Sequence, residues 1–241
     1  MGRNHPGGAR MRAATTRAAT RFTEIVEAAQ RRFGQAGYRR TQIADVARDL
    51  RVSPGLVYHY FESKEALFHV ALEHALDPDS VATPEQLPVR TPPAKATLAM
   101  VRAHAERWVA APLVDAAIAQ ARAADPRAEL ATIVGSFYDG AERRRLGADL
   151  LERSALELPD LANLWFGEIR RAHFAKLARY LKARMDEHQF RSFPDPGIAA
   201  RIIIEIVVFF SRHRHRDPYE KLDDEAVREN VVRFVLAALV P

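Results

Sequence analysis

The 241-residue sequence contains no cysteine, which excludes disulfide bonds, thiolate metal sites and cysteine nucleophiles. It also lacks a His-Glu-x-x-His pair, a phosphate-cradling glycine loop and a nucleophile elbow, so no group of residues points to catalysis. The first arginines precede no apolar stretch of the kind found in a secretory signal. We therefore expect a cytoplasmic protein that is not an enzyme and needs no cofactor or metal.

The sequence also lacks the alternation of apolar and polar residues that is typical of β-strands. Its apolar residues recur at helical spacing, which predicts an all-α fold. The most apolar stretch, GIAARIIIEIVVFF at 197–210, is far shorter than the roughly 20 residues that a membrane span needs. Since it is apolar on nearly all sides, it predicts a helix that is buried all round, and we expect no membrane partner.

Positive charge is distributed unevenly along the chain. Residues 1–76 hold 12 Lys or Arg against 7 Asp or Glu, whereas residues 77–241 hold 24 of each sign. All of the excess positive charge therefore lies in the first third. A basic N-terminal segment on a neutral remainder is typical of a DNA-binding module joined to another domain.

The pattern of helices and breakers predicts four segments. Residues 1–16 read as a disordered basic tail whose arginines either reach DNA or remain solvated. Residues 17–76 form a helix-turn-helix domain with its motif at about 42–61. Residues 77–93 contain five prolines and read as a connection, because no helix survives that density. Residues 94–241 form a larger domain with helices expected at 94–110, 112–123, 126–156, 160–189, 196–213 and 223–239, the third weakened by glycines.

Capping residues define the helices of the first domain. Gly37 is expected to end the first helix in a left-handed conformation. Thr41, Ser53 and Ser63 are each placed to cap the helix that follows. Pro54 then falls at the first turn of its helix, where the missing N–H costs nothing.

The helix that begins after Ser53 has the features of a recognition helix. Its N-terminal half, Ser53, Pro54, Gly55 and Leu56, would face the bases, and Leu56 offers only apolar contact, as to a thymine methyl. Phosphate contacts are expected from Tyr58, His59, Tyr60 and Lys64. Val57 and Phe61 are interpreted as core. The alternative for the aromatic residues is ordinary packing, and at most about half of them can be buried.

These residues resemble the DNA-binding domain of the TetR family of bacterial transcriptional regulators. The resemblance covers about 50 residues: FGQAGY at 33–38, Thr41 with IADVA at 43–47, VSPG at 52–55, YHYF at 58–61 and SKEAL at 63–67. It implies that Thr41 and Gln42, with Tyr58, His59 and Lys64, contact the DNA backbone. One departure is Arg51, which stands where the family usually has glycine. A left-handed arginine there costs on the order of 1 kcal/mol.

The resemblance also implies that the C-terminal domain dimerises and binds a ligand. Helices 160–189 and 196–213, paired with their symmetry mates, would form the interface of a homodimer, and the alternative is that both are monomer core. Candidates for lining a ligand pocket are His104, Trp108, Phe137, Tyr138, Trp165 and Phe166, although each is more often plain core. This aromatic, largely uncharged set suggests an apolar or amphipathic small-molecule effector.

Together these features predict a dimeric, ligand-responsive repressor. It would read the palindromic half-sites of a double-stranded DNA operator and be released from it by the effector. The alternative hypothesis is a helical DNA-binding interaction protein without small-molecule sensing. The operator sequence, the effector and the direction of regulation are not encoded in any pattern that we find.

Overall fold

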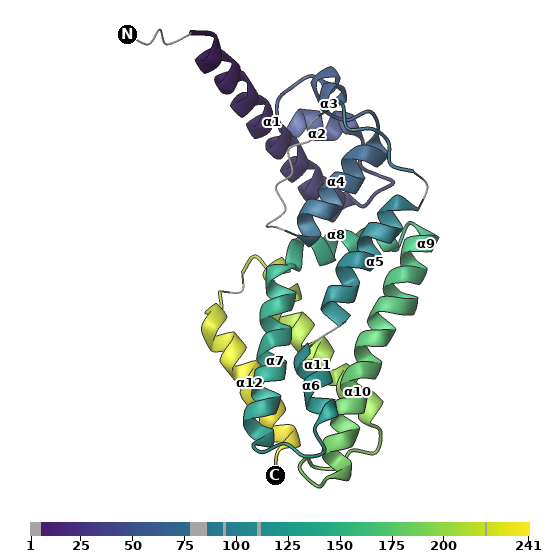
Figure 1. The fold of residues 1–241 in the computed structure, drawn as a ribbon, viewed down its shortest axis with the longest axis vertical. Coiled ribbons are helices and arrows are strands. Elements are labelled where there is room, and N and C mark those ends of the chain that lie inside the picture. Colours follow the sequence, from purple (N-terminus) through teal and green to yellow (C-terminus); the bar gives the residue numbers. More distant parts are fainter. Residues whose placement is uncertain (1–5, 78–85, 94, 110–111, 220) are drawn as a thin grey trace. The chain divides into compact units, whose positions relative to one another are not determined.

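The computed structural model describes the backbone of residues 6–77, 86–93, 95–109, 112–219 and 221–241 (Figure 1). Every regular element in these ranges is helical, apart from one isolated bridge, so the predicted all-α fold is confirmed. In the same ranges, no helix has both the length and the apolar character that crossing a membrane requires. The chain divides into two compact units.

The first unit contains the helix-turn-helix and is completed by a later part of the chain. It comprises the residues up to Val101 together with Leu146–Ala162. Its helices are α1 (Pro6–Ala36), α2 (Ile43–Asp49), α3 (Pro54–Tyr60), α4 (Lys64–Leu76), the start of α5 (Ala96–Val109), most of α8 (Arg145–Ala155) and α9 (Pro159–Ala162). The sequence predicted a single boundary at 77–93, and it gave no sign of this return of the chain.

The core of the first unit forms mainly between α1 and α4. The predicted apolar face of α1 is confirmed, because each of its five residues is buried: Phe22, Ile25, Val26, Ala29 and Phe33. The ring of Phe33 meets that of Phe68 edge to face at 5.1 Å. Gly147 allows α8 to approach α4 closely, since a Cβ atom there would lie 2.3 Å from the carbonyl oxygen of Ala75.

The first helix begins earlier than the sequence indicated. α1 starts at Pro6, so residues 6–16, which were expected to form a disordered tail, continue the helix. Alanine and arginine, which make up much of this stretch, are both good helix formers. Residues 1–5 of the expected tail lie outside the described part of the chain.

The second unit is a bundle built from both sides of the α8 insertion. It comprises Arg102–Arg145 and Asn163–Pro241. Its elements are the rest of α5, α6 (Pro112–Ala119), α7 (Pro126–Arg143), the π-helical η1 (Asn163–Ile169), α10 (Arg170–Asp186), α11 (Pro196–Ser211), the 3₁₀ turn η2 (His213–Arg216) and α12 (Asp224–Leu239). The helix expected at 126–156 is broken in two at Arg144, in the glycine-weakened stretch.

One expectation for this unit is wrong for the single chain. The stretch 197–210 was predicted to be buried on all sides, yet α11 exposes Ile198, Ile202 and Phe209 by 60%, 52% and 49%. The opposite face carries Ala200, Ile203 and Val207, which are buried in the core of the unit. The helix therefore has more apolar surface than one copy of the chain covers.

A buried arginine joins three helices of the second unit. Arg184 on α10 is fully buried, and its guanidinium donates to Glu129 on α7 at 2.8 Å and to the carbonyl oxygen of Ala117 on α6 at 2.7 Å. Glu187 forms a second ion pair with it at 3.0 Å, and the hydroxyl of Tyr180 donates to Glu129 at 3.0 Å. Each charge in the cluster is thus compensated, as burial requires.

We predict that Arg184→Met destabilises the protein by about 3–5 kcal/mol, because it leaves Glu129 without its charge partner. Lys182→Met is the matched control on the same helix, since Lys182 pairs with Asp186 at the exposed surface. It should change stability by less than about 1 kcal/mol. Denaturant unfolding followed by circular dichroism measures both, and equal effects of the two substitutions would contradict the role of the buried cluster.

Candidate DNA-binding surface

The start of α2 is built differently from the prediction. The N-cap is Gln42 rather than Thr41, and the carboxylate of Asp45 accepts a hydrogen bond from the Gln42 N–H at 3.0 Å. That bond lowers the pKa of Asp45. Thr41 is buried, and its hydroxyl donates to the carbonyl oxygen of Gly37 at 2.8 Å. Of the two predicted contacts here, only Gln42 presents its side chain to solvent.

The turns on either side of the motif have the expected geometry. Gly37 has a φ of 85° and its N–H donates to Phe33 at the end of α1, so the left-handed cap is confirmed. Arg51, in the turn between α2 and α3, has a φ of 56°. It adopts the left-handed conformation that glycine occupies without strain, and its side chain is exposed.

The N-terminal half of α3 is exposed and pre-formed. Ser53 caps the helix by accepting from the N–H of Leu56 at 3.3 Å, and Pro54 occupies the first helical position, as predicted. Ser53, Pro54 and Gly55 are exposed, and Leu56 is half-buried. The space around Gly55 is open, because a Cβ atom there would meet only the Ser53 hydroxyl, at 3.8 Å.

The second half of α3 divides its aromatic residues between solvent and core. Tyr58 is 52% exposed and His59 is also exposed, whereas Tyr60 is only 6% exposed. Tyr60 packs against Phe22 with ring centroids 6.5 Å apart, so its ring belongs to the core, and its contact with phosphate stays a prediction. Val57 and Phe61 are fully buried, as expected.

Lys64 opens α4 close to the start of α2. Ser63 caps α4 by accepting from the N–H of Ala66 at 3.1 Å, as predicted. The Lys64 ammonium donates to the carbonyl oxygen of Arg39 at 3.3 Å and lies 4.4 Å from the centre of the Tyr38 ring. Burial lowers its pKa. Lys64 is thus a half-buried charge held in place by the turn between α1 and α2.

Two contacts that the sequence did not predict hold this surface in place. Glu157, just beyond α8, accepts from the N–H of Arg39 at 2.7 Å, and it fills the space that a side chain at Gly37 would need. At the other end of the motif, Val89 pairs with the chain around Phe61, donating to Tyr60 at 2.8 Å. Both partners lie outside the motif, and no local pattern marks them.

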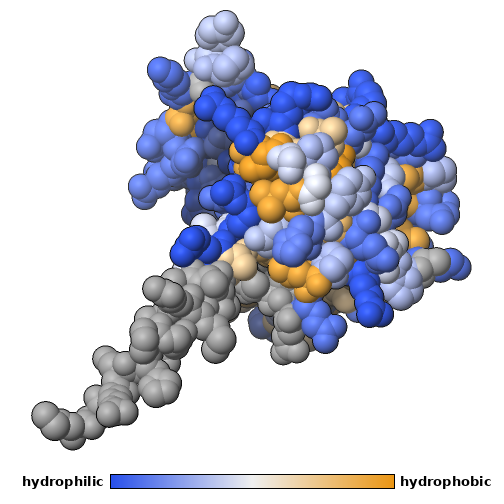
Figure 2. Space-filling view, turned by 90° about the horizontal axis from the view of Figure 1, so that it is seen from above, coloured by the Kyte–Doolittle hydropathy of each residue, from blue (hydrophilic) through white to orange (hydrophobic). Residues whose placement is uncertain are grey.

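Around α3 the surface is largely polar. Seen from above in the orientation of Figure 1, the face is mostly hydrophilic, with one hydrophobic patch near its middle and smaller ones beside it (Figure 2). Such a face suits a polar partner better than the apolar core of a protein interface. In the described residues, the exposed groups of α3 are hydrogen-bonding side chains, a backbone opened by Gly55 and the apolar edge of Leu56.

The six candidates for a ligand pocket all belong to the second unit. Tyr138 is fully buried and its hydroxyl donates to the carbonyl oxygen of Phe210 at 3.3 Å, which is a core arrangement. His104 and Trp165 are buried, and Phe166 is half-buried beside Arg170. The side chain of Trp108 lies outside the described residues.

Phe137, the remaining candidate, contacts a histidine that the sequence did not single out. Its ring centroid lies 5.0 Å from that of His173 on α10. Burial lowers the pKa of His173 to about 4, so its imidazole is neutral at neutral pH. A neutral imidazole beside aromatic rings offers one donor and one acceptor in an otherwise apolar region.

Among described residues, one group in the second unit has metal-ligand chemistry. Potential ligand atoms of Glu142, His215 and Asp224 lie within 4.8 Å of one another. Arg214 already forms an ion pair with Asp224 and, together with burial, holds the pKa of His215 below its usual value. A cation would compete with that guanidinium, so the group is explained by the pairing of η2 with α12.

Comparison with known proteins agrees with the first unit. The family model described as bacterial regulatory proteins, tetR family, matches residues 25–71. The HTH-type transcriptional regulator HbdR of Aromatoleum sp. is 36% identical over 70 residues, which are 29% of this chain and 31% of that protein. The curated relatives that match most strongly are thus covered over less than half of their own length.

Solved structures extend the likeness to the fold of nearly the whole chain. The ketosteroid transcriptional regulator KstR2 of Mycobacterium tuberculosis is 19% identical, with a TM-score of 0.60 and coverage of 92% of this chain and 95% of that one. AibR, solved in complex with isovaleryl coenzyme A and operator DNA, is 17% identical, with a TM-score of 0.54 and coverage of 89% and 97%. Identities this low show the fold alone.

The matching proteins are named as transcriptional regulators, in agreement with the prediction that the chain is not an enzyme. The helix-turn-helix at 25–71 carries the pattern of the bacterial regulatory proteins of the tetR family. The likeness of the rest of the chain to solved TetR-family regulators is one of fold.

Proposed function

We propose that the protein is a homodimeric transcriptional regulator that binds operator DNA through α3 and is released by a small molecule bound in its second unit. The observation that carries the DNA-binding part is the exposure of Ser53, Pro54 and Gly55 on a helix whose other side is anchored by buried Val57 and Phe61. Such a helix presents its N-terminus to a groove, as recognition helices do.

The roles of the surface residues follow from what each side chain can reach. Gln42, Tyr58 and His59 are exposed donors suited to phosphate oxygens. Lys64 adds positive charge at the N-terminus of α4, where anions are favoured. Ser53, Pro54, Gly55 and Leu56 are assigned to the base edges. Thr41 and Tyr60 are left out of the contact set because both are buried.

Selection of bound sequences from random duplex DNA tests this function. We expect an inverted repeat, because two copies of α3 related by a two-fold axis read two half-sites about one helical turn, or a multiple of it, apart. Enrichment of no sequence above a random pool would overturn the proposal. An enriched single half-site would contradict the dimer while keeping DNA binding.

The release mechanism rests on the relatives and on the fold. AibR was solved with a coenzyme A ester and with operator DNA, so a protein of this fold can hold both kinds of partner. In this chain, Phe137 and the neutral imidazole of His173, whose rings are in contact, are the candidate contacts for an apolar ligand. Native mass spectrometry of the purified protein is the direct check. A small molecule released on denaturation supports sensing, and repeated absence of one favours the alternative of a non-sensing interaction protein.

We propose that the exposed side of α11 forms the centre of the dimer interface. We define the α11 apolar face as Ile198, Ile202 and Phe209 together with Phe234 of α12, which is 65% exposed. A groove of about 770 Å³ between α11 and α12 adjoins it, lined by Ile206, Phe210 and Phe234 among others. Helix α10, the partner expected from the sequence, packs along α11. Its exposed positions are mostly charged or small, including Arg171, Ala175 and Arg179.

We expect Tyr58→Phe to weaken binding to every duplex alike, by about 5- to 30-fold, because a hydroxyl donated to a charged phosphate is lost. Tyr60→Phe is the matched control, since its ring is buried against Phe22. That control should leave affinity unchanged. Fluorescence anisotropy on specific and random duplexes measures both. A loss confined to Tyr60→Phe would mean that α3 presents its opposite face.

Substitution of Gly55 separates folding from binding. Gly55→Ala should keep or raise stability by up to about 1 kcal/mol, because the site is open and alanine is the better helix former. DNA affinity should nevertheless fall at least tenfold if the backbone approaches the base pairs at this point. Gly34→Ala, also helical and with nothing within 4 Å, is the control and should affect stability only. Unaltered affinity of Gly55→Ala would remove this residue from the interface.

The dimer is tested by placing a charge on the α11 apolar face. Ile202→Lys should cost roughly 2 kcal/mol for each of its two copies, about 4 kcal/mol in all, which raises the dimer Kd by nearly 1000-fold. Sedimentation equilibrium measures the shift. Tyr219→Lys is the control, because Tyr219 is 90% exposed but lies outside this face. Equal dimerisation of both variants would place the interface elsewhere.

A further inference from the structure

The N-terminal turns of α1 carry positive charge without any acidic residue. From the start of the chain to Thr23 there are five arginines, and the first carboxylate is that of Glu24. These turns extend beyond the other helices of the first unit (Figure 1). From Pro6 to Phe22 the helix rises by about 24 Å at 1.5 Å per residue. None of this stretch belongs to the helix-turn-helix.

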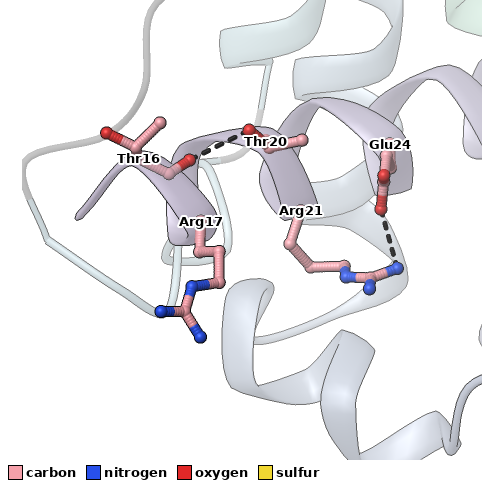
Figure 3. A pocket seen from close by; sticks show the side chains of 5 residues that line it. All are labelled: Thr16, Arg17, Thr20, Arg21 and Glu24. Carbon is pink, nitrogen blue, oxygen red and sulfur yellow. Dashed lines mark hydrogen bonds and ion pairs between the residues drawn. The ribbon is translucent and has the colours of Figure 1, made fainter. Parts of the chain in front are cut away.

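A groove follows this part of α1 and is walled by its polar side chains. Its volume is about 480 Å³, and its lining residues are Thr16, Arg17, Thr20, Arg21 and Glu24. Arg17 and Arg21 leave the helix on the same side (Figure 3). They are four residues apart, as neighbours on a helix face must be.

The two arginines differ in whether their guanidinium is already paired with a carboxylate. Arg21 pairs with Glu24 at 2.7 Å, an exposed contact of low energy. Arg17 is exposed and forms no ion pair with any described residue. Thr20 donates its hydroxyl hydrogen to the carbonyl oxygen of Thr16 at 3.0 Å, so it donates to a phosphate only after its hydroxyl rotates away from that bond. Among the described residues, the groove therefore offers one guanidinium, that of Arg17, without an ion-pair partner, and a second, that of Arg21, whose only ion pair is exposed.

The groove lies next to the recognition helix. Phe22, the residue after Arg21, stacks on Phe61 with centroids 5.1 Å apart and also meets Tyr60. α1 is thus fixed to the C-terminal end of α3 at this point. At 100° per residue, Arg17 and Arg21 point roughly a third of a turn away from Phe22, to the flank of α3. A duplex that receives α3 would continue past this flank.

We propose that the α1 basic face, defined as Arg17 and Arg21 with Thr16 and Thr20, binds the phosphates of duplex DNA that flanks the half-site read by α3. The proposal rests on the proposed DNA-binding function and adds a contact outside the motif. Guanidinium groups and hydroxyls are the usual donors to phosphate oxygens. No side chain of the face is placed to read a base, so its contribution is independent of sequence. An acidic protein partner is the competing occupant.

The test compares Arg17→Ala/Arg21→Ala with the full-length wild type on random-sequence duplex DNA over a range of salt concentrations. Each lost phosphate contact lowers the slope of log K against log salt by about 0.9, so a reduction of roughly 2 per protomer is expected, with about a tenfold loss of affinity. Arg127→Ala/Arg143→Ala is the control, because it removes the same charge from exposed positions of α7. Its slope should match that of the wild type.

A second measurement uses the DNA itself. On a selected site that ends at its half-sites, wild type and Arg17→Ala/Arg21→Ala should bind alike. Extending the duplex by about one helical turn at each end should strengthen binding of the wild type only. Equal slopes and equal responses to length would overturn the α1 proposal while DNA binding by α3 stands. Failure of the wild type to bind any duplex would instead overturn the proposed function. An equal loss of affinity in the Arg127→Ala/Arg143→Ala control would mean that the effect comes from net charge and not from the α1 basic face, which would overturn the α1 proposal.

Discussion

The side of α3 that we propose faces DNA depends on two buried residues in a helix of seven and on the buried residue that follows the helix. A helix as short as α3 is not stable in water by itself, so it forms because Val57, Tyr60 and Phe61 are buried in the first unit. Those positions fall on one side of the helix. Their burial leaves Ser53, Gly55 and Tyr58 on the other side, so the core that stabilises α3 also decides which residues a partner can reach.

The contacts around α3 explain how so small an element is held at a fixed angle. Phe22 of α1 covers it from one side, and Val89 pairs with the chain where it leaves the helix. Glu157 holds the turn that precedes α2 through the N–H of Arg39. None of these three partners lies between Thr41 and Ser63. The helix-turn-helix is therefore a local motif in sequence, but its orientation comes from residues before and after it.

Local geometry was predictable from the sequence because caps and turns depend on neighbouring residues. Ser53, Ser63 and Gly37 act as their types suggest, and Arg51 adopts the left-handed conformation that its place in the turn demands. What the sequence did not decide is how far the core extends around an amphipathic element. Val57 and Phe61 were assigned to the core, but the burial of the Tyr60 ring against Phe22 was not foreseen.

The same limit applies to contacts between distant segments. Arg39 and Glu157 are 118 residues apart, and no sequence pattern around either residue predicts their contact. Thr41 illustrates a subtler case, because a threonine before a helix is a common cap, yet here its hydroxyl bonds back to Gly37 and Gln42 takes the cap position. Apolar periodicity placed α11 correctly, but whether its second side meets the same chain or another copy is not a property of one helix.

The residues of α3 that we assign to base contact limit how such a regulator can distinguish its operator from other DNA. Ser53, Pro54, Gly55 and Leu56 include no guanidinium and no amide, the groups that pair bidentately with guanine and adenine. Discrimination would then come from apolar contact with thymine methyls, from close backbone approach at Gly55 and from the spacing of two half-sites. Affinity would come from phosphate contacts, including those of the α1 basic face, which are blind to sequence.

In such an arrangement the two-fold spacing carries more of the specificity than in a regulator rich in base-reading arginines. A ligand that changes the distance between two copies of α3 would then remove specific binding while leaving each phosphate contact intact. The released protein would still associate weakly with any duplex, and more strongly as salt falls, because its basic first unit is unchanged. Regulation of this kind acts on the geometry between two surfaces whose own chemistry stays constant.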